Sequence, residues 1–173
     1  MGLASVLPFS PASIASSPHN VIRQAWDRLS PLPGGKILFS KAVGLAAPYT
    51  STIDARVEQL RMRYAEVSMA DRRSVRNHLS CVHAIALTNL LELAGNVAVA
   101  YTLPDDARFI VAGLSIEYLK KARGLLRATS ECPEILSSER REYLVPVHIW
   151  NTSGEEVARG ELKTLVGPKR ERS

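Results

Sequence analysis

The spacing of apolar residues changes several times along the chain, and each change predicts a different element. A helix is predicted after Pro18, capped by Asn20, with apolar residues at helical intervals: Val21, Ile22, Ala25, Trp26 and Leu29. The proline- and glycine-rich stretch 30–35 ends it, and a second apolar cluster follows at 36–49. Residues 55–71 alternate between apolar and polar side chains, which predicts one long strand.

The most apolar stretch, 82–99, contains only two ionisable side chains, His83 and Glu92. Its length and composition predict a helix that is apolar almost all round and must therefore be covered on most sides. Thr88, Glu92 and Asn96 recur at four-residue spacing and give this helix one polar stripe. A carboxylate is costly to bury without a partner or a function, so Glu92 is the first candidate for chemistry.

Four more strands are predicted after this helix, at 108–119, 125–132, 142–150 and 157–166. Their short connections favour an antiparallel sheet, and Pro146 predicts an edge strand or a bulge in the third of them. A curved antiparallel sheet wrapped around a long apolar helix is the hotdog fold. We therefore predict an α+β protein with a long central helix, a curved sheet of five to six strands, and N-terminal helices.

Length and composition predict one domain, because 173 residues with 46% hydrophobic content can bury a single core. The domain is expected at 19–167, between a flexible tail at 1–18 and a basic tail at 168–173. Polar residues interrupt the best apolar run, so no membrane span is expected. Cys81 and Cys132 have neither CxxC nor metal-ligand spacing, which favours a reducing compartment, the cytoplasm first and the mitochondrion as the alternative.

The net charge of +5 raises the question of nucleic acid, but aromatic residues are few and no basic run is interleaved with them. The basic clusters suit the phosphates of a small ligand equally well. One of them, formed by Lys120, Lys121 and Arg123, follows the strand after the apolar helix. We expect no nucleic-acid partner.

One combination of spacings resembles a known family. Asn77 is followed six positions later by His83, and Glu92 lies nine positions further on. Together with the strand order, this resembles the hotdog-fold acyl-CoA thioesterases of the PaaI-like class, in particular an uncharacterised branch of it, over roughly residues 26–166. In that class Asn, five residues and His-Gly-Gly lead into the central helix, and an acid follows nine residues after the His. Here Ala84 and Ile85 replace the glycine pair.

The residues suit thioester hydrolysis on physical grounds as well. The free amide of Ala84 at the helix N-terminus could donate to the carbonyl oxygen as it gains charge. Glu92 could act as general base or attack the carbonyl directly, Asn77 could position the water or the thioester, and His83 is expected to hold the loop by hydrogen bonding. Within one helix, His83 and Glu92 are about 13 Å apart along the axis, so one site needs two chains.

The resemblance implies the same assembly, in which Asn77 and Ala84 of one chain meet Glu92 of another. A homodimer or a pair of dimers is therefore expected, with acyl-CoA as substrate and no metal or redox cofactor. In the resembling proteins, the region of Lys120, Lys121 and Arg123 meets the nucleotide of coenzyme A. Many of them also carry a hydroxyl early in the strand after the helix, whereas residues 109–113 have none.

Other interpretations remain open at this stage. Glu92 could be a structural carboxylate, and Asn77 and His78 could only cap the helix or bind the loop. His83 could be a satisfied polar residue at the helix start, Cys81 a buried structural thiol, and the basic cluster a solvated strand end. For the whole protein, the alternatives to a thioesterase are a non-catalytic acyl-CoA or lipid-binding or dimeric interaction module, and an enoyl-thioester hydratase or dehydratase. Water addition to an enoyl thioester, or tight binding without turnover, would distinguish them.

Overall fold

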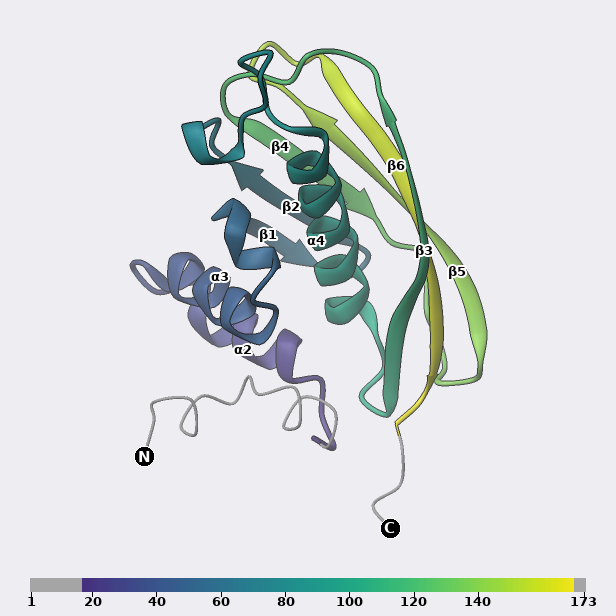
Figure 1. Cartoon of the computed structure of the whole chain (residues 1–173). Helices are drawn as coiled ribbons and strands as arrows, with labels where there is room; N and C mark the ends of the chain where they lie inside the picture. The colour runs from purple at the N-terminus through teal and green to yellow at the C-terminus, as the bar shows by residue number, and fades with distance from the viewer. Residues whose placement is uncertain (1–16, 170–173) are drawn as a thin grey trace.

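The computed structural model describes residues 17–169 and confirms the predicted hotdog fold. In Figure 1 a curved antiparallel sheet wraps around one long helix, α4, while the two N-terminal helices lie to one side of it. The elements, in chain order, are α2 (Val21–Leu29), α3 (Gly35–Ala46), η2 (Thr50–Ile53), β1 (Arg56–Arg61), β2 (Tyr64–Met69), η3 (Arg73–Val75), α4 (Ala84–Thr102), β3 (Ala107–Tyr118), β4 (Leu126–Glu131), β5 (Arg141–Trp150) and β6 (Glu156–Pro168).

The strands follow the order β1-β2-β4-β5-β6-β3, so that β1 and β3 form the two edges. The core lies between the sheet and α4, where Leu90 and Leu91 are fully buried. Two glycines allow the close packing: a Cβ on Gly95 would lie 2.3 Å from Cδ1 of Leu162, and one on Gly160 would lie 2.1 Å from a backbone oxygen of β3. Because the core is closely packed, the position of α4 on the sheet is fixed.

The predicted N-terminal helix and its cap are confirmed in α2. The Asn20 side-chain oxygen accepts a hydrogen bond from the Arg23 amide at 2.9 Å. Its Nδ2 donates to the backbone oxygens of Ala100 and Leu103, at 2.7 and 3.0 Å. One asparagine therefore starts α2 and ties it to the end of α4.

The prediction of a single strand over 55–71 is wrong, because β1 and β2 form a hairpin there. Arg61 pairs with Tyr64, which leaves Met62 and Arg63 as the turn, and Arg63 adopts a left-handed φ of 66°. Alternation continues through the turn, and neither turn residue is a Gly, Pro, Asn or Asp. Distant contacts hold the strained residue: the Arg63 amide donates to Thr102 Oγ1 at 2.9 Å, and its carbonyl accepts from the Cys132 amide at 2.8 Å.

Pro146 does not lie in an edge strand, because β5 is flanked by β4 and β6. The pairing with β4 covers only Val147 to Trp150, however, and Pro146 lies just outside it. The only irregularity in the pairing of β5 with β6 falls between Ile149 and Trp150, away from the proline. The missing amide of Pro146 is thus tolerated where β5 has a neighbour on one side only.

By length and composition α4 could cross a membrane, since its mean hydropathy is 1.3. Of that apolar stretch, 67% is buried inside the protein, so the core of the fold accounts for its apolar character. Most of the two predicted tails, at 1–16 and 170–173, lies outside the described residues. Of the remainder, Pro168 ends β6 and Lys169 Nζ donates to the backbone oxygen of Ser17 at 2.8 Å.

Candidate functional site

The loop that leads into α4 is fixed to the turn after β3. Asp71 is bound by the guanidinium of Arg76, which lowers the pKa of the Asp71 carboxyl, and it also accepts from the Gly124 amide at 3.1 Å. The Val82 amide donates to the Ala122 carbonyl at 2.9 Å. Segments 71–82 and 122–124 are thereby held together and form one rim at the N-terminal end of α4.

Asn77 organises this loop. Its Oδ1 accepts from the amide of Leu79 at 2.9 Å, and from the amide and the thiol of Cys81, both at 3.4 Å. The side-chain oxygen is therefore used within the loop. Its Nδ2 has no hydrogen-bond partner in the part of the chain that the structure describes, and it is the group that remains for a ligand.

His83 is the N-cap of α4, and its Nδ1 accepts from the Ile85 amide at 3.0 Å. An accepting Nδ1 carries no proton, so the neutral ring holds its proton on Nε2. The expectation that His83 holds the loop agrees with this geometry. The side chain is exposed, which leaves Nε2 accessible to solvent.

Replacing His83 with alanine should lower the free energy of unfolding by about 1 kcal/mol, because the cap of α4 is lost. His83→Asn should recover most of this, since the asparagine oxygen can accept the same bond. Denaturant unfolding of the two variants measures the difference. If activity falls equally in both while only the alanine variant is destabilised, His83 has a chemical role beyond capping.

The amide of Ala84 is the first of α4 and has no acceptor among residues 17–169. Its carbonyl accepts from Thr88 Oγ1 at 3.0 Å and from the hydroxyl of Tyr118 at 3.3 Å, and the two hydroxyls are 2.8 Å apart. Tyr118 ends β3 and was not predicted as a site residue. The sequence signal for Tyr118 is its position between the apolar strand and the basic cluster. Only the fold shows that its hydroxyl contacts α4.

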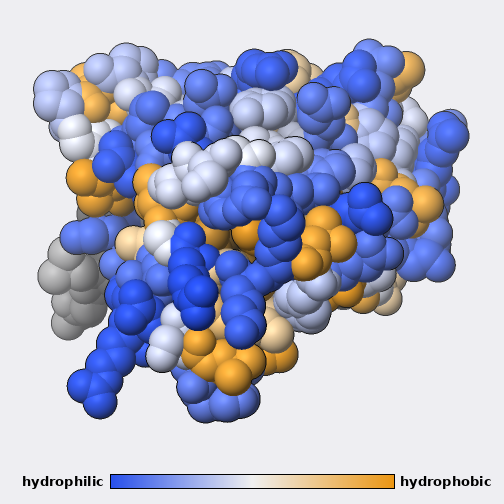
Figure 2. All heavy atoms as spheres, turned by 90° about the horizontal axis from the view of Figure 1, so that it is seen from above, coloured by the Kyte–Doolittle hydropathy of each residue, from blue (hydrophilic) through white to orange (hydrophobic). Residues whose placement is uncertain are grey.

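A cavity of about 320 Å3 lies at this end of α4, lined among others by Asn77, Cys81, Ala84, Tyr118, Lys120 and Lys121. It brings together two of the predicted catalytic residues and two of the predicted phosphate ligands. Figure 2 views the molecule from this end, where hydrophilic side chains predominate and hydrophobic ones form small separate groups. A polar, charged ligand head suits such a surface.

The three basic residues predicted to bind phosphate are not equally free. Lys120 pairs with Glu155 at 2.6 Å. Arg123 donates to the carbonyls of Ser80 and Leu79, at 3.3 and 3.5 Å, and so supports the loop. Within the described chain, only Lys121 of the three has no partner.

Glu92 lies two turns further along α4 and does not line this cavity. It is half-buried, and within residues 17–169 its carboxylate has neither a hydrogen bond nor an ion pair. It belongs to the row of α4 residues that are not fully buried in the described chain, here called the open row: Ala84, Ile85, Thr88, Glu92, Asn96 and Ala100. The predicted polar stripe thus coincides with the open side of the helix.

The edge strand β3 leaves apolar surface open beside this row. On the side of the core, Phe109, Val111, Leu114 and Ile116 are only partly buried. Ile110 points to the opposite face of the strand and is 66% exposed. One side of β3 pairs with β6, and the other has no neighbouring strand in the described residues. An unpaired apolar edge of twelve residues is a natural place for another strand.

Both cysteines are free and buried, and burial raises the pKa of the Cys132 thiol to about 11. Cys81 lines the cavity, yet its thiol donates to Asn77. The described residues contain no group of three or more His, Cys, Asp or Glu side chains that could hold a metal ion.

Comparison with known proteins identifies relatives of the fold. A protein-family model described as Domain of unknown function (DUF4442) matches residues 35–166. A structural-genomics crystal structure whose name states no function is 32% identical, covers 85% of this chain and 98% of its own, and has a TM-score of 0.73. No curated protein sequence matches this chain.

Two more distant structures are named as thioesterases. A probable thioesterase from Pseudomonas aeruginosa is 20% identical, with 79% of this chain and 97% of its own covered and a TM-score of 0.66. A thioesterase family protein from Silicibacter pomeroyi is 16% identical, with 75% and 96% covered and a TM-score of 0.63. At such identities the likeness concerns the fold, and it agrees with a thioesterase-type scaffold.

Proposed function

The chain belongs to the family described as Domain of unknown function (DUF4442), and from this hotdog scaffold we propose that it hydrolyses an acyl-CoA thioester at a site shared by two copies. One observation carries the proposal: a free helix amide in a cavity with Lys121, and an unpartnered carboxylate on the open side of the same helix. In one chain these groups are too far apart to meet. In two antiparallel copies they can converge.

The proposed dimer forms along β3. If two copies pair antiparallel along this edge, the Tyr118 end of one strand lies beside the Ala107 end of the other. The two α4 helices then also run antiparallel, and the N-terminus of one approaches the middle of its twin. This pairing would cover the apolar residues of β3 and the open row of α4. A tetramer would be two such dimers.

In the proposed reaction, a water oxygen attacks the thioester carbon while Glu92 of the second copy takes one of its protons. The carbonyl electrons move to oxygen, which is stabilised by the Ala84 amide and the positive end of the α4 dipole. The intermediate then collapses, the carbon–sulfur bond breaks, and the sulfur takes up the proton held by Glu92. The products are a carboxylic acid and the free thiol of coenzyme A.

The remaining site residues would place the substrate. The free Nδ2 of Asn77 can donate to the thioester or to the water, and Lys121 can meet a phosphate of the nucleotide. Lys120 and Arg123 would reach a phosphate only by leaving Glu155 and the loop carbonyls. We propose that their main effect is to hold the rim of the cavity. The buried, free thiols fit a reducing compartment such as the cytoplasm.

Purified protein should release free thiol from acyl-CoA, and this can be followed with a thiol-reactive dye over short, long and aromatic acyl groups. A variant with Lys121→Glu should show a raised KM for acyl-CoA with little change in kcat, because the repelled group is the nucleotide and not the reacting carbon. The same acyl group on a short thiol without nucleotide should be insensitive to this substitution. No thiol release from any acyl-CoA would contradict hydrolysis.

A second candidate, a non-catalytic acyl-CoA-binding module, is favoured by one feature. The oxygen of Asn77 and Nδ1 of His83 are both used to build the loop, and residues 109–113 supply no hydroxyl to hold water. Tight binding of acyl-CoA by calorimetry, without turnover, would support this candidate over hydrolysis.

A further inference from the structure

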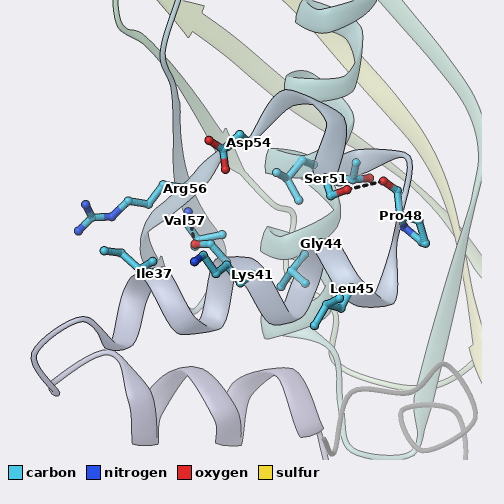
Figure 3. A pocket seen from close by; sticks show the side chains of 14 residues that line it. Ile37, Lys41, Gly44, Leu45, Pro48, Ser51, Asp54, Arg56 and Val57 are labelled. Atoms are coloured by element: carbon cyan, nitrogen blue, oxygen red, sulfur yellow. Dashed lines mark hydrogen bonds between the residues drawn. The ribbon is translucent and has the colours of Figure 1, made fainter. Parts of the chain in front are cut away.

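A second cavity, of about 550 Å3, lies beside α4 and contains none of the residues of the proposed reaction. It is lined by α3, η2, the start of β1 and one residue of α4. Figure 3 shows Ile37, Lys41, Gly44 and Leu45 following one another along α3, with Ser51 and Asp54 across from them. Its size is typical of sites for small ligands.

The lining of this cavity is mostly apolar. Its aliphatic lining comes from three elements and consists of Ile37, Val43, Leu45, Val57 and Leu93. Ile37 and Leu45 are 44% and 68% exposed, although they face the cavity. The polar Ser40 on the same wall is already occupied, because its hydroxyl accepts from the Val57 amide at 2.9 Å and donates to the Lys36 carbonyl. The cavity therefore offers a ligand mainly apolar contacts, and Ser40 is not free to form a hydrogen bond with it.

Charge at the rim is asymmetric. Lys41 has no acidic partner among the described residues, and Arg56 stands nearby on β1, paired loosely with Glu58 at 3.5 Å. Asp54 lies across the cavity from Lys41 and makes no ion pair within residues 17–169. A single anionic group is thus attracted to the α3 side of the rim and repelled from the η2 side.

We propose that this cavity binds a free straight-chain fatty acid, with the tail among Ile37, Leu45 and Leu93 and the carboxylate at Lys41. An apolar hollow with one unpaired cation at its rim is complementary to a molecule that has one apolar chain and one negative head. The site does not depend on the proposed hydrolysis, since it contains neither Ala84 nor Glu92.

Calorimetric titration with dodecanoate below its micelle concentration tests the site. Ile37→Glu places a negative charge in the apolar lining and should weaken binding at least tenfold. Leu38→Glu is the matched control, because Leu38 is the adjacent residue, is 53% exposed and does not line the cavity. It should bind as the unmodified protein does. Equal binding by the two variants would overturn the proposal, as would no binding by the unmodified protein.

Fatty acids of different length test where the aliphatic tail binds, and Lys41 variants test where the carboxylate binds. Affinity should rise about two- to fourfold for each methylene from octanoate to dodecanoate, because each added group is removed from water. Lys41→Met should weaken dodecanoate binding, Lys41→Arg should retain it, and a dodecyl trimethylammonium ion should bind no better to the unmodified protein than to Lys41→Met. Affinity that does not depend on chain length or on Lys41 would contradict the assignment.

The same aliphatic chain also occurs in an acyl-CoA, so the experiment must distinguish a free fatty acid from the acyl tail of the thioester. Dodecanoyl-CoA binding is measured with Glu92→Gln protein, in which the thioester should not be consumed. If Ile37→Glu weakens dodecanoate but not dodecanoyl-CoA, the cavity is a site for the free acid. If it weakens both equally, the cavity holds the tail of the thioester and the free-acid assignment is overturned, while the proposed hydrolysis stands.

Discussion

Ala84→Pro should lower kcat for thioester hydrolysis about 100- to 1,000-fold, because it removes the amide proton that we propose stabilises the oxyanion. Few substitutions delete a backbone donor without disturbing the chain, but this position allows it. Ala84 is the first residue of α4, where proline is favoured, and its amide has no partner within the described residues. The preceding residue, His83, already has the φ of −65° and ψ of 141° that a following proline requires.

The matched control is Ala84→Gly, which keeps the amide and restores the residue typical of the resembling thioesterases. It should retain activity, and its cost in stability should be small because the site is at the helix end. Circular dichroism and denaturant unfolding should show that the proline variant is folded. A folded proline variant with nearly unchanged kcat would remove this amide from the mechanism.

The sequence predicted the fold well because the hotdog topology has strong local signals. The apolar stretch 82–99 could only be a covered helix, and the four strands after it are bounded by turns that propensity recognises. The hairpin between β1 and β2 was missed because its turn, Met62 and Arg63, has no local signal. Contacts with Thr102 and Cys132, far away in the sequence, stabilise it.

For the site, the sequence shows the spacing of Asn77, His83 and Glu92. It does not show which hydrogen bonds the polar atoms of these side chains form. Whether a side-chain oxygen faces a ligand or its own loop depends on hydrogen bonds that form only in the folded state, as at Asn77. The same holds for Arg123, which supports the loop carbonyls. Tyr118 meets the carbonyl of Ala84, 34 residues earlier, only because β3 runs back along α4.

The open row of α4 links the prediction of the fold to the prediction of the site. The four-residue spacing of this stripe is visible in the sequence, and in the structure that row is only partly buried. One chain thus exposes apolar surface and an unpartnered carboxylate on the same side. In the proposed dimer, the partner copy buries this apolar surface and uses the carboxylate.

Glu92→Gln should lower kcat about 100- to 10,000-fold with little change in KM, because an amide cannot take a proton from water. The shape of the side chain is kept, and the free energy of unfolding should change little since the carboxylate makes no ion pair in the described residues. Glu134→Gln, at an exposed glutamate away from α4, is the control and should be fully active. Stopped-flow and steady-state thiol release provide the comparison.

Mixing the two inactive variants tests whether the site is shared. In a heterodimer of Ala84→Pro and Glu92→Gln subunits, one site carries both lesions and the other carries neither, because each site takes its amide from one copy and its acid from the other. Random reassortment of equal amounts makes half of the dimers mixed, so about a quarter of the unmodified activity should return. Recovery should require subunit exchange and should fail when each variant is kept as a preformed homodimer. A reassorted mixture no more active than its parents would show that the amide and the carboxylate do not serve one site across two chains.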